Sequence, residues 1–237
     1  MSAIQLEWGA EGVRRLAREC AVLVIVDVLS FTTAVEVAVS RGAVVYPYPA
    51  RDDSAQAFAQ EHGAVLAGSR REDGFSLSPA SLTALPAGMR LVLPSPNGAT
   101  LTLLAGGAPV VAGCLRNAAA AARAARAIAQ ADGRPIGIVP AGERWPDGSL
   151  RPALEDWLGA GAVIASLAGE RTPEAAAAEA SFRALQADLP GALAKIPSGQ
   201  ELIERGFAQD VALAAEWNAG QAAPVLSGGA FRPAQTD

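Results

Sequence analysis

Apolar runs of five to seven residues, rich in Val, Ile and Leu, recur along the chain and are separated by segments with a helical pattern. Short continuous runs of this kind are typical of strands that are buried on both faces, as in parallel sheets. Their alternation with helices indicates βαβ units. The predicted strands cover residues 22–28, 43–49, 64–68, 91–95, 109–113 and 136–142.

The segments between these runs predict helices, and the segment after them is helical throughout. The Ala-rich stretches belong to the helices, because Ala has the highest helix propensity. We therefore predict an α/β fold of three layers, with a largely parallel sheet and helices on both faces. Residues 1–237 would form a single domain, or a bilobed one whose helical C-terminal part starts at about 172. The predicted helices cover residues 31–41, 52–62, 98–105, 117–131, 153–168 and 172–205.

Composition and charge narrow the class of partner. Of the 237 residues, 51% are hydrophobic and 18% are charged, which is the composition of a globular protein with a substantial core. The net charge is −5 and no block of Lys or Arg occurs, which argues against a nucleic-acid or polybasic membrane surface. The uncharged stretch 91–115 contains Pro94, Pro96 and Gly98, so it does not predict a membrane helix. We expect a small-molecule partner.

The N-terminal segment and the cysteines indicate the compartment. The segment has no basic region followed by an apolar one, so we predict no signal peptide and expect a cytoplasmic protein. Cys20 and Cys114 lie far apart without metal-ligand spacing, which indicates reduced, structural thiols. We also expect a homo-oligomer, most simply a dimer.

Several common catalytic designs lack support in the sequence. The single histidine, His62, lies at the end of a predicted helix, which disfavours a Ser-His triad or phosphoryl transfer through histidine. The chain has no G-x-x-x-x-G-K-[ST], no G-x-G-x-x-G after a strand and no G-x-S-x-G. The chemistry must therefore come from carboxylates, hydroxyls, amides and arginines.

The carboxylates of interest follow the predicted strands. Asp27 ends a strand that is buried on both faces, where a charge is costly unless it is paired or binds a metal; the alternative is that it caps the next helix. Glu143 follows another strand, and Glu155 and Asp156 fall in the first turn of a helix, where the helix dipole alone would stabilise them. Adjacent helical residues diverge by roughly 100°, so only one of Glu155 and Asp156 is expected to face a shared metal.

Turns between strands and helices predict anion binding near these acids. The segment with Ser30, Thr32 and Thr33 and the segments 96–100 and 113–118 each place backbone N–H groups at a helix N-terminus. Simple capping of each helix is the alternative. Arg70 and Arg71 lie beside glycines in a polar loop that suits bidentate binding of an anion. Acids for a divalent ion beside cradles for an anion indicate Mg²⁺-assisted chemistry on a phosphorylated small molecule.

The chain carries a series of motifs, which are, in chain order, "VIVDVLSFTTAVEVAVSRGA", "AGSRRE" with "FSLSP", "SPNGAT", "GCLRNAAAAA", "IVPAGER", "ALEDWLGAG" and "IPSGQELIERGFAQDV". Over nearly the whole chain this series resembles the 2-phosphosulfolactate phosphatase family, the ComB-like proteins of coenzyme M biosynthesis. The resemblance implies a ComB-like α/β fold. It also implies a Mg²⁺-dependent phosphatase that releases phosphate from 2-phospho-3-sulfolactate and from some related phosphorylated 2-hydroxy acids.

Two departures from the family pattern concern the substrate. The family typically has an arginine in "DVLRATT", where this chain has Ser30 followed by Phe31. A family segment that reads "GFDLGNSP" is the shorter "GFSLSP" here. Both changes remove groups that could bind an anion, so recognition of the sulfonate is expected to differ.

These observations together predict the roles of individual residues. Asp27 would hold Mg²⁺ or act as a nucleophile that forms an aspartyl-phosphate. The rival interpretation is a non-catalytic protein that binds phosphorylated or sulfonated metabolites. The predicted catalytic residues are Asp27, Glu143 and Asp156; the predicted metal ligands are Asp27, Glu143, Glu155 and Asp156; the predicted substrate-binding residues are Ser30, Thr32, Thr33, Arg70, Arg71, Asn97, Gly98, Thr100, Arg116 and Asn117.

Overall fold

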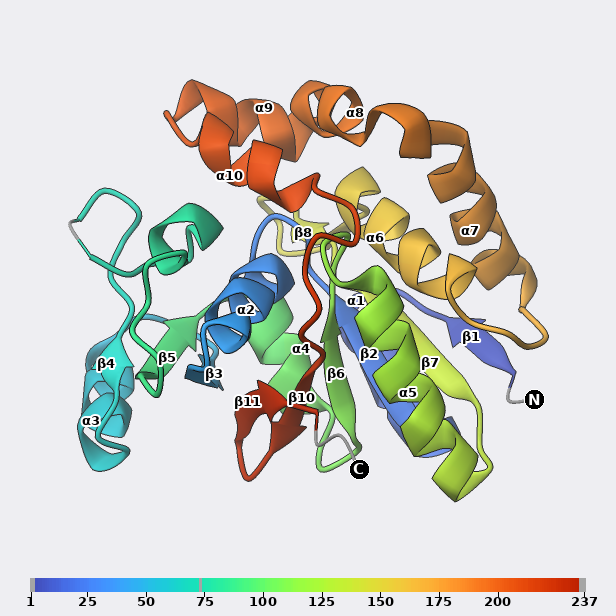
Figure 1. Cartoon of the computed structure of the whole chain (residues 1–237), viewed down its shortest axis with the longest axis horizontal. Coiled ribbons are helices and arrows are strands. Elements are labelled where there is room, and N and C mark those ends of the chain that lie inside the picture. The colour runs from blue at the N-terminus through green and yellow to red at the C-terminus, as the bar shows by residue number, and fades with distance from the viewer. Residues whose placement is uncertain (1–2, 73, 235–237) are drawn as a thin grey trace.

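A nine-stranded sheet runs through the centre of the molecule, in a computed structural model that describes residues 3–72 and 74–234 (Figure 1). The strand order is β1-β7-β2-β6-β10-β11-β3-β5-β4, and a separate short hairpin pairs β8 with β9. The strands are β1 (Ile4–Leu6), β2 (Val22–Val26), β3 (Val44–Tyr48), β4 (Val65–Leu66), β5 (Arg90–Pro94), β6 (Val110–Gly113), β7 (Ile136–Pro140), β8 (Glu143–Arg144), β9 (Leu150–Arg151), β10 (Pro224–Ser227) and β11 (Ala230–Pro233).

The sheet is largely parallel, as the sequence predicts, with one antiparallel insertion. All six predicted strands are present, as β2 to β7. The insertion is the hairpin of β10 and β11, whose register places Val225 opposite Val111 of β6 and Phe231 opposite Val45 of β3. The C-terminal segment thus fills the middle of the sheet and joins its two parallel parts.

Helices cover both faces of the sheet, which confirms the three-layer prediction. Helices α1, α2 and α4 pack on one face, and α3, α5 and α6 pack on the other. Helices α8, α9 and α10 form an arc above the upper end of the strands (Figure 1). The helices are α1 (Gly9–Glu19), α2 (Phe31–Ser40), α3 (Asp53–Glu61), α4 (Gly98–Leu104), α5 (Ala118–Asp132), α6 (Leu154–Ala165), α7 (Pro173–Leu185), α8 (Leu189–Lys195), α9 (Pro197–Glu204) and α10 (Ala208–Ala214).

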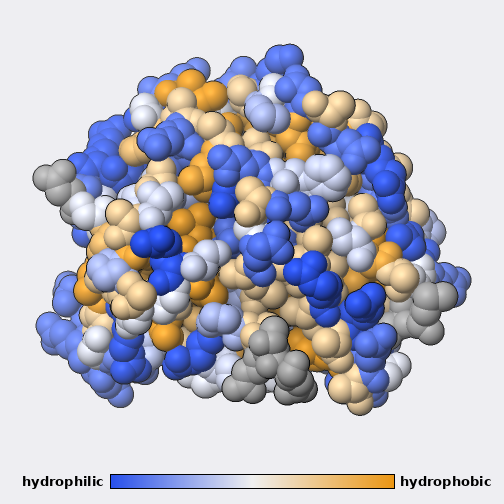
Figure 2. Space-filling view, viewed as in Figure 1, coloured by the Kyte–Doolittle hydropathy of each residue, from blue (hydrophilic) through white to orange (hydrophobic). Residues whose placement is uncertain are grey.

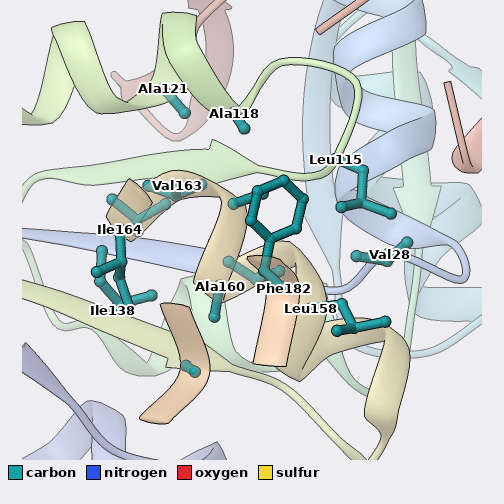
Figure 3. Packing of buried hydrophobic residues seen from close by; sticks show 14 of the residues in the cluster. Val28, Leu115, Ala118, Ala121, Ile138, Leu158, Ala160, Val163, Ile164 and Phe182 are labelled. Atoms are coloured by element: carbon teal, nitrogen blue, oxygen red, sulfur yellow. The ribbon is translucent and has the colours of Figure 1, made fainter. Parts of the chain in front are cut away.

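Strand β2 shows how the pattern of the sequence produces the two cores. Every residue of β2 is buried; Val22, Val24 and Val26 face the α5 and α6 side, whereas Leu23 and Ile25 face the α2 and α4 side. Phe182 of α7 packs in the core on the α5 and α6 side, among side chains from α5, α6 and β7 (Figure 3). Truncation of such a buried aromatic side chain costs about 3–5 kcal/mol.

No helix in the described ranges is both long enough and apolar enough to span a bilayer. Hydrophilic and apolar residues are interspersed on the face seen in Figure 2. Single exposed apolar side chains of this kind are normal for a folded domain.

Candidate active site

A cleft of about 450 Å³ lies beyond the carboxyl ends of β2, β5 and β7, with α9 on its opposite wall. In an open α/β sheet this is the expected place for a ligand. The cleft is lined by carboxylates and cations together. Its charged members are Asp27, Arg70, Arg71, Glu143, Glu201 and Arg205.

Asp27 is fixed at the buried end of the cleft by two helix N-termini. Its Oδ1 accepts the N–H of Phe31 at 3.1 Å, from α2, and its Oδ2 accepts the N–H of Gly98 at 2.8 Å, from α4. Burial raises the pKa of Asp27, while these backbone donors and the Arg70 charge oppose the rise. The carboxylate is therefore rigidly placed, and each oxygen keeps a lone pair for a further partner.

The turn after β2 uses its hydroxyl groups to hold Asp27 in place. Thr32 Oγ1 accepts the N–H of Asp27 at 2.9 Å and donates to the carbonyl oxygen of Asp27 at 2.8 Å. Thr33 Oγ1 donates to the carbonyl of Val28 at 2.8 Å. Both threonines are fully buried and neither lines the cleft, so their hydroxyls shape the backbone that carries the carboxylate.

Glu143 faces the same cleft from β8. Its Oε2 accepts a hydrogen bond from Asn97 Nδ2 at 2.9 Å, and both residues line the cleft. Burial, reinforced by the negative charge of Asp27, raises the pKa of Glu143 to about 7. Glu143 therefore changes charge near neutral pH, in a place where a cation would favour its ionised form.

Glu155 and Asp156 point to different places, as their adjacent helical positions require. Burial raises the pKa of Glu155, and a hydrogen bond from Ser198 of α9 opposes that rise. Asp156 accepts the N–H of Val28 at 2.7 Å and the N–H of Gly142 at 2.8 Å, one with each oxygen. Asp156 thus ties the ends of β2 and β7 together, and it does not line the cleft.

Arg70 is held on the cleft wall by polar partners from two distant parts of the chain. Its guanidinium forms an ion pair with Asp210 of α10, which is 1% exposed, and its Nη2 donates to Ser30 Oγ at 2.7 Å. Arg71 is exposed and lines the cleft beside it. The positively charged wall therefore has one half-buried, oriented guanidinium and one exposed guanidinium.

Besides Thr32, Thr33 and Gly98, three further predicted substrate-binding residues, Thr100, Arg116 and Asn117, lie outside the cleft lining. Thr100 Oγ1 donates to the carbonyl of Ser95 at 3.4 Å. Arg116 bonds to the buried Glu36, with 2.9 Å between Arg116 Nε and Glu36 Oε2, and also pairs with Glu216. The side chain of Asn117 is fully buried. Asn117 bonds to the N–H of Cys114 and to the carbonyls of Ala112 and Ala222.

The structure adds three groups that the sequence interpretation did not assign. Ser198, Glu201 and Arg205 of the α9 segment line the cleft. They lie in the stretch "IPSGQELIERGFAQDV", which resembles the family but carries no recognisable motif for chemistry. Only the arc of C-terminal helices brings this stretch above the strand ends.

The cleft offers few metal ligands, but they are of the type that Mg²⁺ prefers. Asp27 and Glu143 present hard carboxylate oxygens. Burial raises the pKa of Glu143, Glu155 and Asp156, and the charge of Asp27 adds to the rise, a repulsion that a divalent cation would relieve. Across the described residues, no three Asp, Glu, His or Cys side chains are grouped to hold a metal ion. Mg²⁺ is commonly bound by one or two carboxylates together with waters and phosphate oxygens.

Comparison with known proteins decides the family. A profile of the family described as "2-phosphosulpholactate phosphatase" matches residues 11–229. The chain belongs to this family. It is also 31% identical over 205 residues, 83% of this chain and 82% of the relative, to a "Probable 2-phosphosulfolactate phosphatase" of Carboxydothermus hydrogenoformans. Membership makes the protein a phosphatase, that is, a phosphoric monoester hydrolase.

Proposed function

We propose that this phosphatase hydrolyses 2-phospho-3-sulfolactate to 3-sulfolactate and inorganic phosphate, and that Mg²⁺ is its cofactor. The observation that supports this proposal most is the combination in one cleft of a rigid buried carboxylate, Asp27, with three arginines. Family membership and the name of the relative support the substrate. Related phosphorylated 2-hydroxy acids belong to the same substrate class.

Different residues of the cleft would act on the phosphoryl group and on the leaving group. Asp27 and Glu143 would hold Mg²⁺, which when bound withdraws charge from the phosphoryl oxygens. Arg70 and Arg71 would neutralise the carboxylate and the developing charge of the leaving alcohol. In hydrolysis the oxygen of water bonds to phosphorus, the bond between phosphorus and the ester oxygen breaks, and the leaving oxygen takes a proton.

Asp27 has two possible roles, as metal ligand and as nucleophile. We favour direct attack by water with Asp27 as metal ligand, because each oxygen of Asp27 accepts one backbone N–H and keeps a lone pair that a cation can use. A substrate made chiral at phosphorus with sulfur and oxygen isotopes tests this choice. Direct attack gives inversion at phosphorus, whereas an aspartyl-phosphate intermediate gives retention.

A non-catalytic binding protein is disfavoured by the charges of the cleft. Asp27 and Glu143 both line the cleft, and ionised carboxylates repel an anionic ligand unless a cation lies between them. A protein that only binds anions gains nothing from them.

The proposal also includes a cytoplasmic location, a homodimer and a role in coenzyme M biosynthesis. Light scattering after size-exclusion chromatography tests whether the protein is a dimer.

Phosphate release by the purified protein tests the proposal. The substrates are 2-phospho-3-sulfolactate, 2-phospholactate and a panel of common phosphorylated metabolites, each with Mg²⁺ and with EDTA. We expect Mg²⁺-dependent release with the highest kcat/KM for 2-phospho-3-sulfolactate. A higher kcat/KM for an unrelated phosphate ester would contradict the substrate, and full activity in EDTA would contradict the cofactor.

A further inference from the structure

Two arginines from distant parts of the chain meet on one aromatic ring at the cleft. The Cζ atom of Arg70 lies 5.5 Å from the centroid of the Phe207 ring, and that of Arg205 lies 5.9 Å from the same centroid. Both arginines line the cleft. Distances below about 6 Å allow a favourable cation–π contact, and Phe207 therefore holds both guanidinium groups at this wall.

The charge at this place is only partly balanced. Arg70 forms an ion pair with the buried Asp210, whereas none of the ion pairs among residues 3–72 and 74–234 involves Arg205. After burial and the opposing effect of Asp210, the charge of Arg205 is the next influence on Arg70, whose pKa it lowers. The two cations thus repel each other, and Asp210 neutralises one of them, while Glu201 of the same wall pairs with Arg151.

The backbone at the end of α9 places Arg205 beside the Phe207 ring. Arg205 caps α9, Gly206 adopts a φ of +92°, and the N–H of Phe207 returns to the carbonyl of Leu202 at 2.8 Å. A left-handed residue at this point reverses the chain, so that Arg205 and Phe207 lie on the same side. Arg205 therefore has a defined position although its side chain is exposed.

Arg70 lies between the turn after β2 and Arg205. Its Nη2 donates to Ser30 Oγ at 2.7 Å, three residues after Asp27, and its guanidinium shares the Phe207 ring with Arg205. A ligand whose phosphate sits near Asp27 would therefore extend a second anionic group past Arg70 toward Arg205. That order fits a short molecule with anions at separate carbons.

We infer that Arg205, with Phe207 and Arg70, forms a binding site for the sulfonate of the substrate and that Arg205 determines specificity for sulfonated phosphate esters. The inference rests on the proposed function. A sulfonate is permanently ionised, and its three oxygens accept hydrogen bonds in the geometry that a guanidinium offers. Loss of one charge-assisted hydrogen bond costs about 1.5–3 kcal/mol, or about tenfold to a hundredfold in affinity.

Kinetics of Arg205→Gln with two substrates test the inference. The ratio of kcat/KM for 2-phospho-3-sulfolactate to that for 2-phospholactate, which lacks the sulfonate, is expected to fall by about tenfold or more, mainly through KM. Arg126→Gln removes the same charge from an exposed position on α5 and is expected to keep the wild-type ratio. An unchanged ratio in Arg205→Gln, whether from equal loss on both substrates or from no loss, would overturn the inference.

Calorimetric titration with 3-sulfolactate and with lactate separates this inference from the proposed function. If the wild type hydrolyses neither ester, the proposed function fails. Binding of 3-sulfolactate that Arg205→Gln weakens by about tenfold or more would still support the sulfonate site. Absence of 3-sulfolactate binding to the wild type, or equal binding by the variant, would reject the site.

Discussion

The N–H of Gly98 donates to Asp27 Oδ2 at 2.8 Å, and no other residue could replace Gly98 without moving that carboxylate. A Cβ atom on residue 98 would lie 2.7 Å from Asp27 Oδ2 and would overlap the Phe31 ring. Helix α4 can thus approach the end of β2 this closely because residue 98 is a glycine, which has no side chain. The same closeness orients the carboxylate at the centre of the cleft.

Gly98→Ala should therefore inactivate the enzyme more than it destabilises it. Overpacking of a tight site costs about 1–3 kcal/mol of unfolding free energy. A displaced Asp27 should lower kcat by about a hundredfold or more. Steady-state kinetics and urea unfolding of the variant measure the two effects. Near-normal kcat in a folded Gly98→Ala protein would show that the position of Asp27 is not critical.

Asp156→Asn tests whether Asp156 serves the backbone or the cleft. The asparagine would turn an amide donor toward the N–H of Val28 or of Gly142, and one buried N–H without an acceptor costs about 1–3 kcal/mol. We expect a loss of this size in urea unfolding, with Mg²⁺ affinity nearly retained. Asp53→Asn, in an exposed first helical turn, is the control. Unchanged stability with abolished Mg²⁺ binding would instead make Asp156 a metal ligand.

Stability of the metal-free protein should fall as the pH rises, because of Glu143. Its pKa is about 7 in the folded protein, against an ordinary value of 4.5, so the folded state holds the proton more tightly. The stabilising contribution is complete below pH 4.5 and is lost as the pH rises through about 7. The melting temperature should be lower at pH 8 than at pH 5.5, by an amount that Glu143→Gln reduces. An identical pH dependence in that variant would contradict the assignment.

Binding of Mg²⁺ should show the opposite dependence on pH. A ligating carboxylate must be ionised, so the affinity for Mg²⁺ should increase between pH 6 and pH 8 as Glu143 loses its proton. Titration calorimetry at several pH values measures this increase. Affinity that is independent of pH, or equal in Glu143→Gln, would remove Glu143 from the metal site.

Asp210→Asn should disturb Arg70 from the far side of the cleft wall. The carboxylate of Asp210 pairs with Arg70 and also accepts the N–H of Ala80 at 3.2 Å. Loss of the charge should raise KM about tenfold or more and lower the melting temperature. Asp210→Glu should restore part of the KM effect if Asp210 acts by positioning Arg70. Equal KM values for the wild type and Asp210→Asn would show that Arg70 does not need this partner.

The sequence predicted the layers of the fold because hydrophobic periodicity reports burial directly. It did not indicate α1, β1 or the hairpin of β10 and β11, although the two glycines at 228 and 229 form a recognisable turn signal between short apolar runs. The hairpin inserts between β6 and β3, and that placement depends on contacts across the whole chain. The local pattern of hydrophobic and polar residues does not indicate such long-range contacts.

The candidate site was predictable only where it follows a strand. Asp27, Asn97 and Glu143 each come after a strand, and parallel topology places all three in the cleft. Asn117 also follows a strand, yet its side-chain amide forms hydrogen bonds with three backbone groups and does not face the cleft. A binding asparagine and a structural one look the same in sequence. Arg205 was missed because only the fold of the C-terminal helices brings it to Arg70.

Asp27 is the residue on which the proposed phosphatase site for 2-phospho-3-sulfolactate depends. Its role is tested by the rate of phosphate release from this ester at saturating Mg²⁺ by the wild type and by Asp27→Asn, with thermal unfolding to confirm that the variant is folded. We expect turnover by the wild type and a loss of about a thousandfold or more in kcat for the folded variant. Comparable turnover by the two proteins would show that Asp27 does not have this role.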